Sequence, residues 1–137
     1  MALTHLADTS VLTRLSHADI RKAIGDLLVR RALGRCALSD LEVGFSARNA
    51  GEWDVIQRAL RPFGLIAVSP VDVARARGVQ RTLAALGLKD RKVPDLLIAA
   101  AAEREDLILL HYDRDFDLIA EATGQPTQWI VERGRID

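Results

Sequence analysis

Short, mostly apolar segments alternate along this chain with longer segments of helical periodicity, and this alternation constrains the fold more than any other feature. The apolar segments span residues 3–7, 35–38, 65–68, 107–110 and 128–131, and each has the length of a strand. Because they are largely continuous runs, both faces of the sheet are expected to be covered. The alternation predicts an α/β fold with three layers, α/β/α, in which helices flank a parallel, roughly five-stranded sheet.

The intervals between the apolar segments predict seven helices. They span residues 9–15, a segment capped by Ser16, a segment opening at Ser39 and running to 47, and residues 52–60, 70–86, 94–105 and 114–122. Pro70 and Pro94 suit first helical turns, and Gly124 suits the end of the last helix. The length of 137 residues fits one domain, 1–137, with a sizeable hydrophobic core.

Several classes of protein are disfavoured by composition. The longest uninterrupted apolar run has seven residues, 96–102, whereas a bilayer span needs about 20. The N-terminus has no basic start before an apolar stretch, so a secretory signal is not expected. Cys36 is the only cysteine and cannot form an internal disulfide. These features predict a cytoplasmic protein without a membrane segment.

The net charge of zero hides an uneven distribution. Residues 58–92 hold eight basic and two acidic residues, whereas residues 93–137 hold ten acidic and four basic ones. A basic block beside an acidic block could serve a phosphate-rich ligand held near metal-binding carboxylates. Ordinary solvated helix faces are the other interpretation, and charge alone favours it.

Acidic residues follow or precede the predicted strands at corresponding ends. Asp8 follows the first strand, Glu42 lies in the first turn of the helix after the second, and Asp95 begins the helix before the fourth. Asp113, Asp115 and Asp117 follow the fourth strand. In a parallel sheet, ligands bind outside the carboxyl ends of the strands. Carboxylates gathered there would suit a hard cation such as Mg²⁺ or Mn²⁺.

Each acid also has a purely structural interpretation. Asp8 and Asp113 could cap the helices that follow them, and Asp95 could complement a helix dipole. Ser39 and Glu42 fit a capping box. Helix capping, however, does not require these acids to converge at one end of a sheet. The sequence contains no Walker A loop, dinucleotide glycine fingerprint, serine elbow or zinc-ligand spacing.

Four segments together resemble the PIN domain, specifically the ribonuclease toxin of a VapBC-type toxin–antitoxin pair. They are residues 6–12 (LADTSVL), 39–44 (SDLEVG), 94–100 (PDLLIAA) and 111–116 (HYDRDF), in family order. The resemblance spans nearly the whole chain and implies a PIN-like fold. It also implies an acidic cluster that binds Mg²⁺ or Mn²⁺ and cleaves RNA, with Asp8, Glu42, Asp95 and Asp113 as the catalytic residues.

The resemblance further assigns individual roles. Asp8, Asp95 and Asp113 are the implied metal ligands; Asp115 is an accessory acid, and Thr9 or Ser10 matches a hydroxyl residue that orients the site. Hydrolysis at such a site leaves a 5′-phosphate and a 3′-hydroxyl. Asp117 lies outside the motif and receives no role.

The basic block is expected to hold the RNA backbone, through Arg75, Arg77, Arg81, Lys89, Arg91 and Lys92. The expected partners are RNA, a cognate antitoxin and a second copy of the chain, with Val43, Trp53 and Ile56 as candidate interface residues. The main alternative function is a PIN-like scaffold that binds RNA or a partner without cleaving it. A metal-dependent phosphatase and a DNA nuclease are further alternatives.

Overall fold

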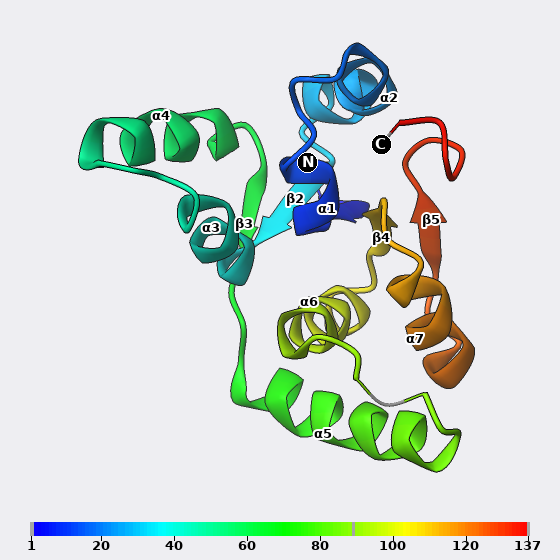
Figure 1. Cartoon of the computed structure of the whole chain (residues 1–137). Helices are drawn as coiled ribbons and strands as arrows, with labels where there is room; N and C mark the ends of the chain where they lie inside the picture. The colour runs from blue at the N-terminus through cyan, green and yellow to red at the C-terminus, as the bar shows by residue number, and fades with distance from the viewer. Residues whose placement is uncertain (1, 89, 137) are drawn as a thin grey trace.

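The computed structural model, which describes residues 2–88 and 90–136, contains one five-stranded sheet flanked by helices (Figure 1). The strands are β1 (His5–Ala7), β2 (Leu33–Cys36), β3 (Gly64–Ile66), β4 (Ile108–His111) and β5 (Thr127–Trp129). The helices are α1 (Thr9–Leu12), α2 (Ala18–Val29), α3 (Ala37–Gly44), α4 (Ala50–Leu60), α5 (Pro70–Ala85), α6 (Val93–Arg104) and α7 (Asp115–Thr123). The predicted α/β class is confirmed.

The strand order is β3-β2-β1-β4-β5, and all the pairings are parallel, as predicted. In the central strand, Leu6 lies opposite Gly34 of β2 and Leu109 of β4. The chain builds outward from β1 to β3 and then returns to the other side of β1. The strand order therefore reverses between β1 and β4, and such a switch point opens a crevice at the carboxyl ends of the strands.

Helices cover both faces of the sheet because consecutive strand residues point to opposite sides. Leu6 and Leu109 belong to a buried cluster with residues of α5, α6 and α7, including Phe116. Ala7 and Leu110 belong to a second cluster with residues of α1 and α2. Figure 1 shows α2 on one side of the sheet and α5, α6 and α7 on the other. The predicted three layers are thus observed.

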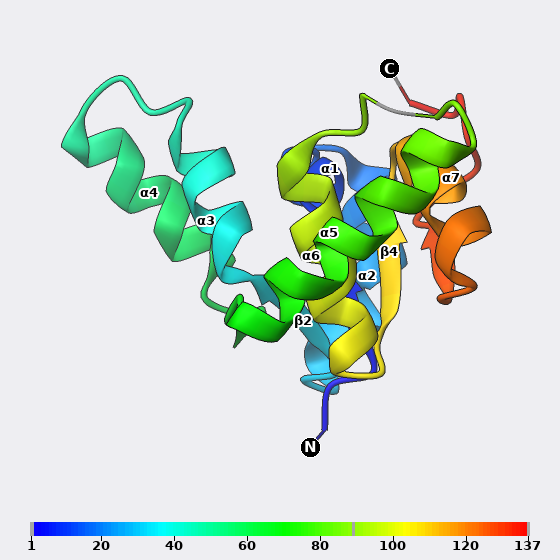
Figure 2. The ribbon, with the colours of Figure 1, turned by 90° about the horizontal axis from the view of Figure 1, so that it is seen from below.

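Helices α3 and α4 contact each other and extend from the body of the molecule (Figure 2). Large apolar side chains of these helices are exposed, namely Leu41, Trp53 and Val55, as is Phe45, which directly follows α3. In the part of the chain that the structure describes, no helix combines the length and apolarity that crossing a membrane requires.

Several predicted boundaries were wrong by one to three residues; the first helix, for example, ends at Leu12 rather than at residue 15. Strand β2 ends at Cys36, and α3 begins at Ala37 rather than at Ser39. The apolar run continues across this junction, so periodicity cannot separate the strand from the helix; Ala37 and Leu38 are good helix formers and join the helix. Helix α2 is capped by His17 rather than Ser16, without a side-chain hydrogen bond. Gly124 ends α7 in the left-handed conformation, as predicted.

Candidate active site

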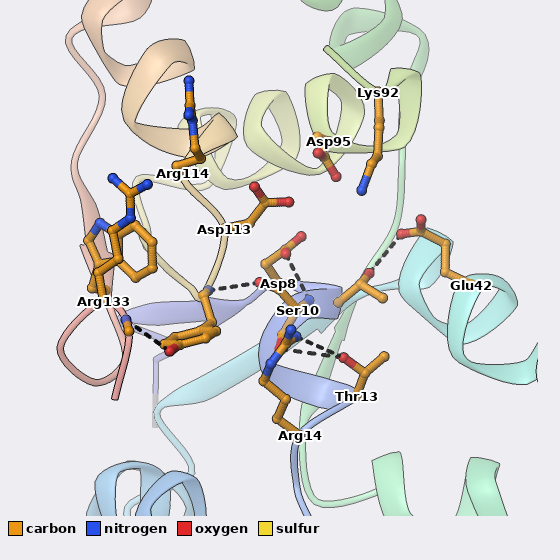
Figure 3. A pocket seen from close by; sticks show the side chains of 14 residues that line it. Asp8, Ser10, Thr13, Arg14, Glu42, Lys92, Asp95, Asp113, Arg114 and Arg133 are labelled. Carbon is orange, nitrogen blue, oxygen red and sulfur yellow. Dashed lines mark hydrogen bonds between the residues drawn. The ribbon is translucent and has the colours of Figure 1, made fainter. Parts of the chain in front are cut away.

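Four acidic side chains from separate segments line one cavity of about 520 Å³ at the switch point between β1 and β4 (Figure 3). We refer to Asp8, Glu42, Asp95 and Asp113 as the carboxylate quartet. Asp8 directly follows β1, and its backbone N–H donates to the carbonyl of Leu110 in β4 at 2.8 Å. The sheet itself therefore fixes the position of Asp8.

The capping interpretation of Asp8 is also confirmed. One carboxylate oxygen, Oδ2, accepts a hydrogen bond from the backbone N–H of Ser10 at 2.8 Å, which caps α1. The other oxygen, Oδ1, is buried and has no hydrogen-bond partner among the residues that the structure describes. A helix cap needs only one of the two oxygens, so capping does not account for the second.

Asp95 lies in the first turn of α6 and, like Asp8, has a buried carboxylate oxygen without a hydrogen-bond partner in the described part of the chain. Its side chain is buried, and the unpartnered oxygen is Oδ2. Burial raises the pKa of Asp8 to about 6. Burial, followed by the nearby charges of Asp8 and Asp113, raises the pKa of Asp95 to about 7. Buried carboxylates that disfavour one another's ionisation are stabilised by a cation, and an all-oxygen donor set suits a hard divalent ion.

Two overlapping groups of acids could provide the metal ligands. Carboxylate oxygens of Asp95, Asp113 and Asp115 lie within 4.8 Å of one another. Asp115, however, forms an ion pair with Arg91 at 2.7 Å, so its charge is already compensated. Asp8 faces the same cavity with an unpartnered buried oxygen. Asp95 and Asp113 belong to both groups, and the third member is either Asp8 or Asp115. Because no cation of the described chain pairs with the unpartnered oxygen of Asp8, Asp8 is favoured over Asp115.

A hydroxyl group connects Glu42 to the first helix. Thr9 Oγ1 donates to Glu42 Oε1 at 2.7 Å and lies 2.7 Å from Ser39 Oγ, a side chain that is fully buried. The capping-box interpretation of Ser39 and Glu42 was therefore wrong, because α3 begins two residues earlier and Ser39 is inside its first turn. Ser39 was missed as a supporting residue, since nothing in its local sequence indicates a contact with Thr9.

Ser10 supports the other side of the cavity. Its Oγ atom accepts a hydrogen bond from the backbone N–H of Tyr112 at 2.8 Å. This bond joins the start of α1 to the loop after β4, which carries Asp113. The backbone N–H of Asp115 in turn donates to Asp113 Oδ1 at 2.9 Å. This bond from the first residue of α7 holds the Asp113 side chain in a defined direction.

The Thr9 hydroxyl provides a first test of the site. Thr9→Val keeps the shape of the side chain but removes the hydrogen bond to Glu42, so we expect metal affinity or cleavage to fall about 10- to 100-fold. Thr9→Ser keeps the hydroxyl and serves as the matched control. Calorimetric titration with Mn²⁺ and a cleavage assay measure the two effects. Equal behaviour of Thr9→Val and the wild type would show that Glu42 needs no such support.

The structure disperses the five described residues of the six predicted to bind RNA. Lys92 lines the cavity, Arg91 pairs with Asp115, and Arg75 pairs with Glu103 at 2.7 Å. Arg77 and Arg81 lie on α5 and are not part of the cavity lining. Lys89 lies outside the described residues.

Basic residues that the sequence did not single out line the cavity instead. They are Arg14, Arg114 and Arg133. Arg114 and Arg133 follow β4 and β5, so the same strand-end argument that found the acids could have indicated them. Arg14 follows α1 and carried no comparable signal.

Comparison with known proteins agrees with this architecture. The family model described as the PIN domain matches residues 6–122. Ribonuclease VapC51 of Mycobacterium tuberculosis is 53% identical over 137 residues, which cover 100% of both chains. Ribonuclease VapC18 of the same organism is 38% identical over 132 residues, which cover 94% of this chain and 96% of that protein.

A solved structure supports the fold independently of close sequence similarity. The DNA-bound VapBC complex from Salmonella typhimurium matches with a TM-score of 0.80 at 14% identity, covering 94% of this chain and 99% of that chain. The strand order, the match to the family model and the two relatives lead to one conclusion: the chain belongs to the PIN-domain family and is related to its VapC members.

Proposed function

We propose that this protein is a metal-dependent endoribonuclease, the toxin of a toxin–antitoxin pair. The observation that carries the proposal is the convergence of the carboxylate quartet on one cavity, with two buried carboxylate oxygens that have no hydrogen-bond partner in the described chain. A scaffold that only binds RNA has no need of four converging acids. The two relatives named as ribonucleases, which align over nearly the whole chain, support the same activity.

Within this proposal, Asp8, Asp95 and Asp113 hold the cation, which is Mg²⁺ or Mn²⁺. The bound ion supplies Lewis-acid polarisation of the scissile phosphate and lowers the pKa of water. Glu42, directed by Thr9, orients the attacking water and accepts its proton.

Neighbouring residues have supporting roles in the same proposal. Asp115 is an accessory acid, Ser10 fixes the loop that carries Asp113, and Lys92 attracts the substrate at the rim of the cavity. The contribution of Arg75, Arg77, Arg81, Lys89 and Arg91 to RNA binding stays a prediction.

Incubation of the purified, metal-stripped protein with total RNA tests the activity. We expect fragments to form when Mg²⁺ or Mn²⁺ is added and not in the presence of EDTA. Single-stranded DNA and a phosphomonoester, offered in parallel, examine the nuclease and phosphatase alternatives. Retention of RNA without cleavage at any metal concentration would instead support the scaffold.

We further propose that the protein acts in the cytoplasm, where its RNA substrates are made, and that it binds a cognate antitoxin and a second copy of itself. The exposed apolar residues of α3 and α4 support the proposed contacts with a partner. Of the sequence-predicted interface residues, Trp53 and Ile56 lie on α4, and Trp53 is 46% exposed. Val43 is packed against the core and is less suited to this role.

Substitutions on α3 and α4 test the proposed assembly. We expect the protein alone to elute as a dimer and, with its antitoxin, as a larger complex. Phe45→Ser with Trp53→Ser should weaken at least one of these assemblies, because both substitutions remove apolar side chains that are exposed in the monomer. Phe45 is 91% exposed and therefore contributes little to the stability of the monomer. Light scattering after size exclusion measures the masses. A monomer at high micromolar concentration would contradict the dimer.

A further inference from the structure

Basic side chains line the cavity together with the carboxylate quartet. In Figure 3, Arg114 and Arg133 lie on one side of Asp113, whereas Glu42 and Lys92 lie on the other. We define the arginine lobe as Arg14, Arg114 and Arg133 with the rings of Tyr112 and Trp129, all of which line the cavity. Its basic residues come from the segment after α1, the loop after β4 and the segment after β5.

Two guanidinium groups of the arginine lobe lie over its two aromatic rings. The Cζ atom of Arg14 lies 5.1 Å from the centre of the Tyr112 ring, and that of Arg133 lies 5.9 Å from the Trp129 ring. The two rings contact each other edge to face, with centres 5.5 Å apart and an interplanar angle of 84°. A guanidinium over a ring is held by its face, which leaves N–H groups at its edge for an anion. Arg14 has fewer of them to offer, because its Nη1 already donates to the carbonyl of Ser10 at 2.7 Å.

Two arginine side chains of the lobe have no counterion among the residues that the structure describes. The guanidinium groups of Arg114 and Arg133 form neither an ion pair nor a hydrogen bond within that part of the chain, although Asp113 lines the same cavity. Arg35, Arg91 and Arg104, by contrast, each pair with a carboxylate at 2.7–2.8 Å. An exposed arginine without a partner is ordinary on its own. Two such groups beside a third arginine, in the cavity that holds the carboxylate quartet, point to an anionic ligand.

The backbone that carries Arg133 is held in place. The Tyr112 hydroxyl accepts hydrogen bonds from the N–H groups of Gly134 at 3.1 Å and Ile136 at 3.0 Å, and it donates to the carbonyl of Ile136. Arg135 adds an ion pair with Asp19 of α2 at 3.0 Å. The C-terminal segment is therefore held at Gly134, Arg135 and Ile136, directly after Arg133, and the backbone at Arg133 does not have to be ordered when a ligand binds.

We propose that the arginine lobe is a phosphate-binding subsite for the RNA strand whose scissile phosphate lies at the carboxylate quartet. This inference rests on the proposed ribonuclease function. A strand that presents one phosphate to the acids carries further phosphates on either side, and guanidinium groups bind such oxygens in a planar, bidentate manner. Arg114 and Arg133 bind the neighbouring phosphate, and Tyr112 is the positioning residue that holds Arg133. Interactions with phosphates fix the register of the strand without reading its sequence.

Anisotropy of a labelled single-stranded RNA tests the subsite, in an Asp8→Asn background that is expected not to cleave. Arg114→Ala with Arg133→Ala should weaken binding roughly tenfold or more at low salt. The slope of log K against log[KCl] should fall by roughly 0.7 for each arginine–phosphate interaction that the substitutions remove. Arg58→Ala with Arg61→Ala removes the same charge from exposed positions of α4 and the turn after it, and should leave both quantities unchanged.

Two further variants examine how the lobe is built. Arg133→Lys keeps the charge and should retain the salt slope. Tyr112→Phe should weaken binding and raise KM without changing kcat, but it should have no additional effect in the Arg133→Ala background, because it acts through Arg133. An equal loss of affinity in both backgrounds would overturn the positioning role.

The outcomes separate the subsite from the activity. Wild-type binding by the Arg114→Ala, Arg133→Ala variant, or a loss of affinity confined to Arg77→Ala with Arg81→Ala on α5, would overturn the arginine lobe. If the wild-type enzyme still cleaves RNA in either case, the proposed ribonuclease function stands. A wild-type protein that binds RNA through the lobe but never cleaves it would support the subsite and overturn the activity.

Discussion

The Asp8→Asn variant is expected to cleave RNA about 10³-fold more slowly than the wild type, or slower still, at saturating Mg²⁺. A factor of that size corresponds to about 4 kcal/mol in the activation free energy. The substitution removes a negative charge where the structure places an unpartnered buried oxygen, and the ion would lose one of its ligands. Asn still caps α1 through its carbonyl oxygen, so the fold should be preserved. RNA binding should be maintained or become tighter, because a charge that repels phosphate is gone.

Asp117→Asn is the matched control for this experiment. Asp117 is exposed, accepts hydrogen bonds from Trp129 Nε1 at 3.2 Å, and is not among the residues that line the cavity. An Asn side chain can still accept from the indole, so we expect less than a tenfold effect on cleavage. If Asp117→Asn were as damaging as Asp8→Asn, Asp113 would be the wrong choice of fourth acid. The single-turnover cleavage rates of Asp8→Asn, Asp117→Asn and the wild type provide this comparison.

Divalent cations are expected to produce a second large effect, on thermal stability. At a concentration of Mg²⁺ or Mn²⁺ one hundred times its Kd, the melting temperature of the metal-stripped protein should rise by about 5–10 °C. The ion offsets the mutual repulsion of Asp8 and Asp95, whose ionised forms are already disfavoured by burial. Asp8→Asn with Asp95→Asn should abolish the rise. An equal rise in the double variant would show that the cation binds elsewhere.

The same measurement has a predictable pH dependence. The pKa of Asp8 is raised to about 6 and that of Asp95 to about 7 in the folded protein, above the value near 4 of an unfolded chain. The folded state therefore binds more protons than the unfolded state between about pH 4 and 7, and the metal-free protein loses stability as the pH rises through that window. Because the cation must displace those protons, its stabilising effect should be largest near pH 8 and small near pH 5.5. An effect independent of pH would contradict ligation by Asp8 and Asp95.

The sequence predicts the fold because one physical rule dominates it. Apolar strands separated by amphipathic helices can bury both faces only as a parallel sheet between two helical layers, and the structure has that arrangement. The convergence of Asp8 and Asp113 follows from the same rule, since both closely follow strands that are neighbours across the switch point.

Contacts between long side chains could not be predicted in this way. The ion pair of Arg91 with Asp115, the hydrogen bond of Thr9 with Glu42 and the approach of Arg133 to Trp129 each depend on the direction of a flexible side chain after the elements have packed. No local pattern encodes that direction. The start of α3 was misplaced for a related reason, because apolar residues continue unbroken from β2 into the helix.

Cleavage of a defined RNA in water enriched with oxygen-18 tests the central proposal most directly. Hydrolysis by a water molecule at the carboxylate quartet predicts that each new 5′-phosphate carries one oxygen-18 atom, that the other product ends in a 3′-hydroxyl, and that neither forms without a divalent cation. Mass spectrometry of the products from a single turnover gives both the end groups and the isotope content. Products ending in a 2′,3′-cyclic phosphate, with no oxygen-18 in a 5′-phosphate and formed equally well in EDTA, would contradict it.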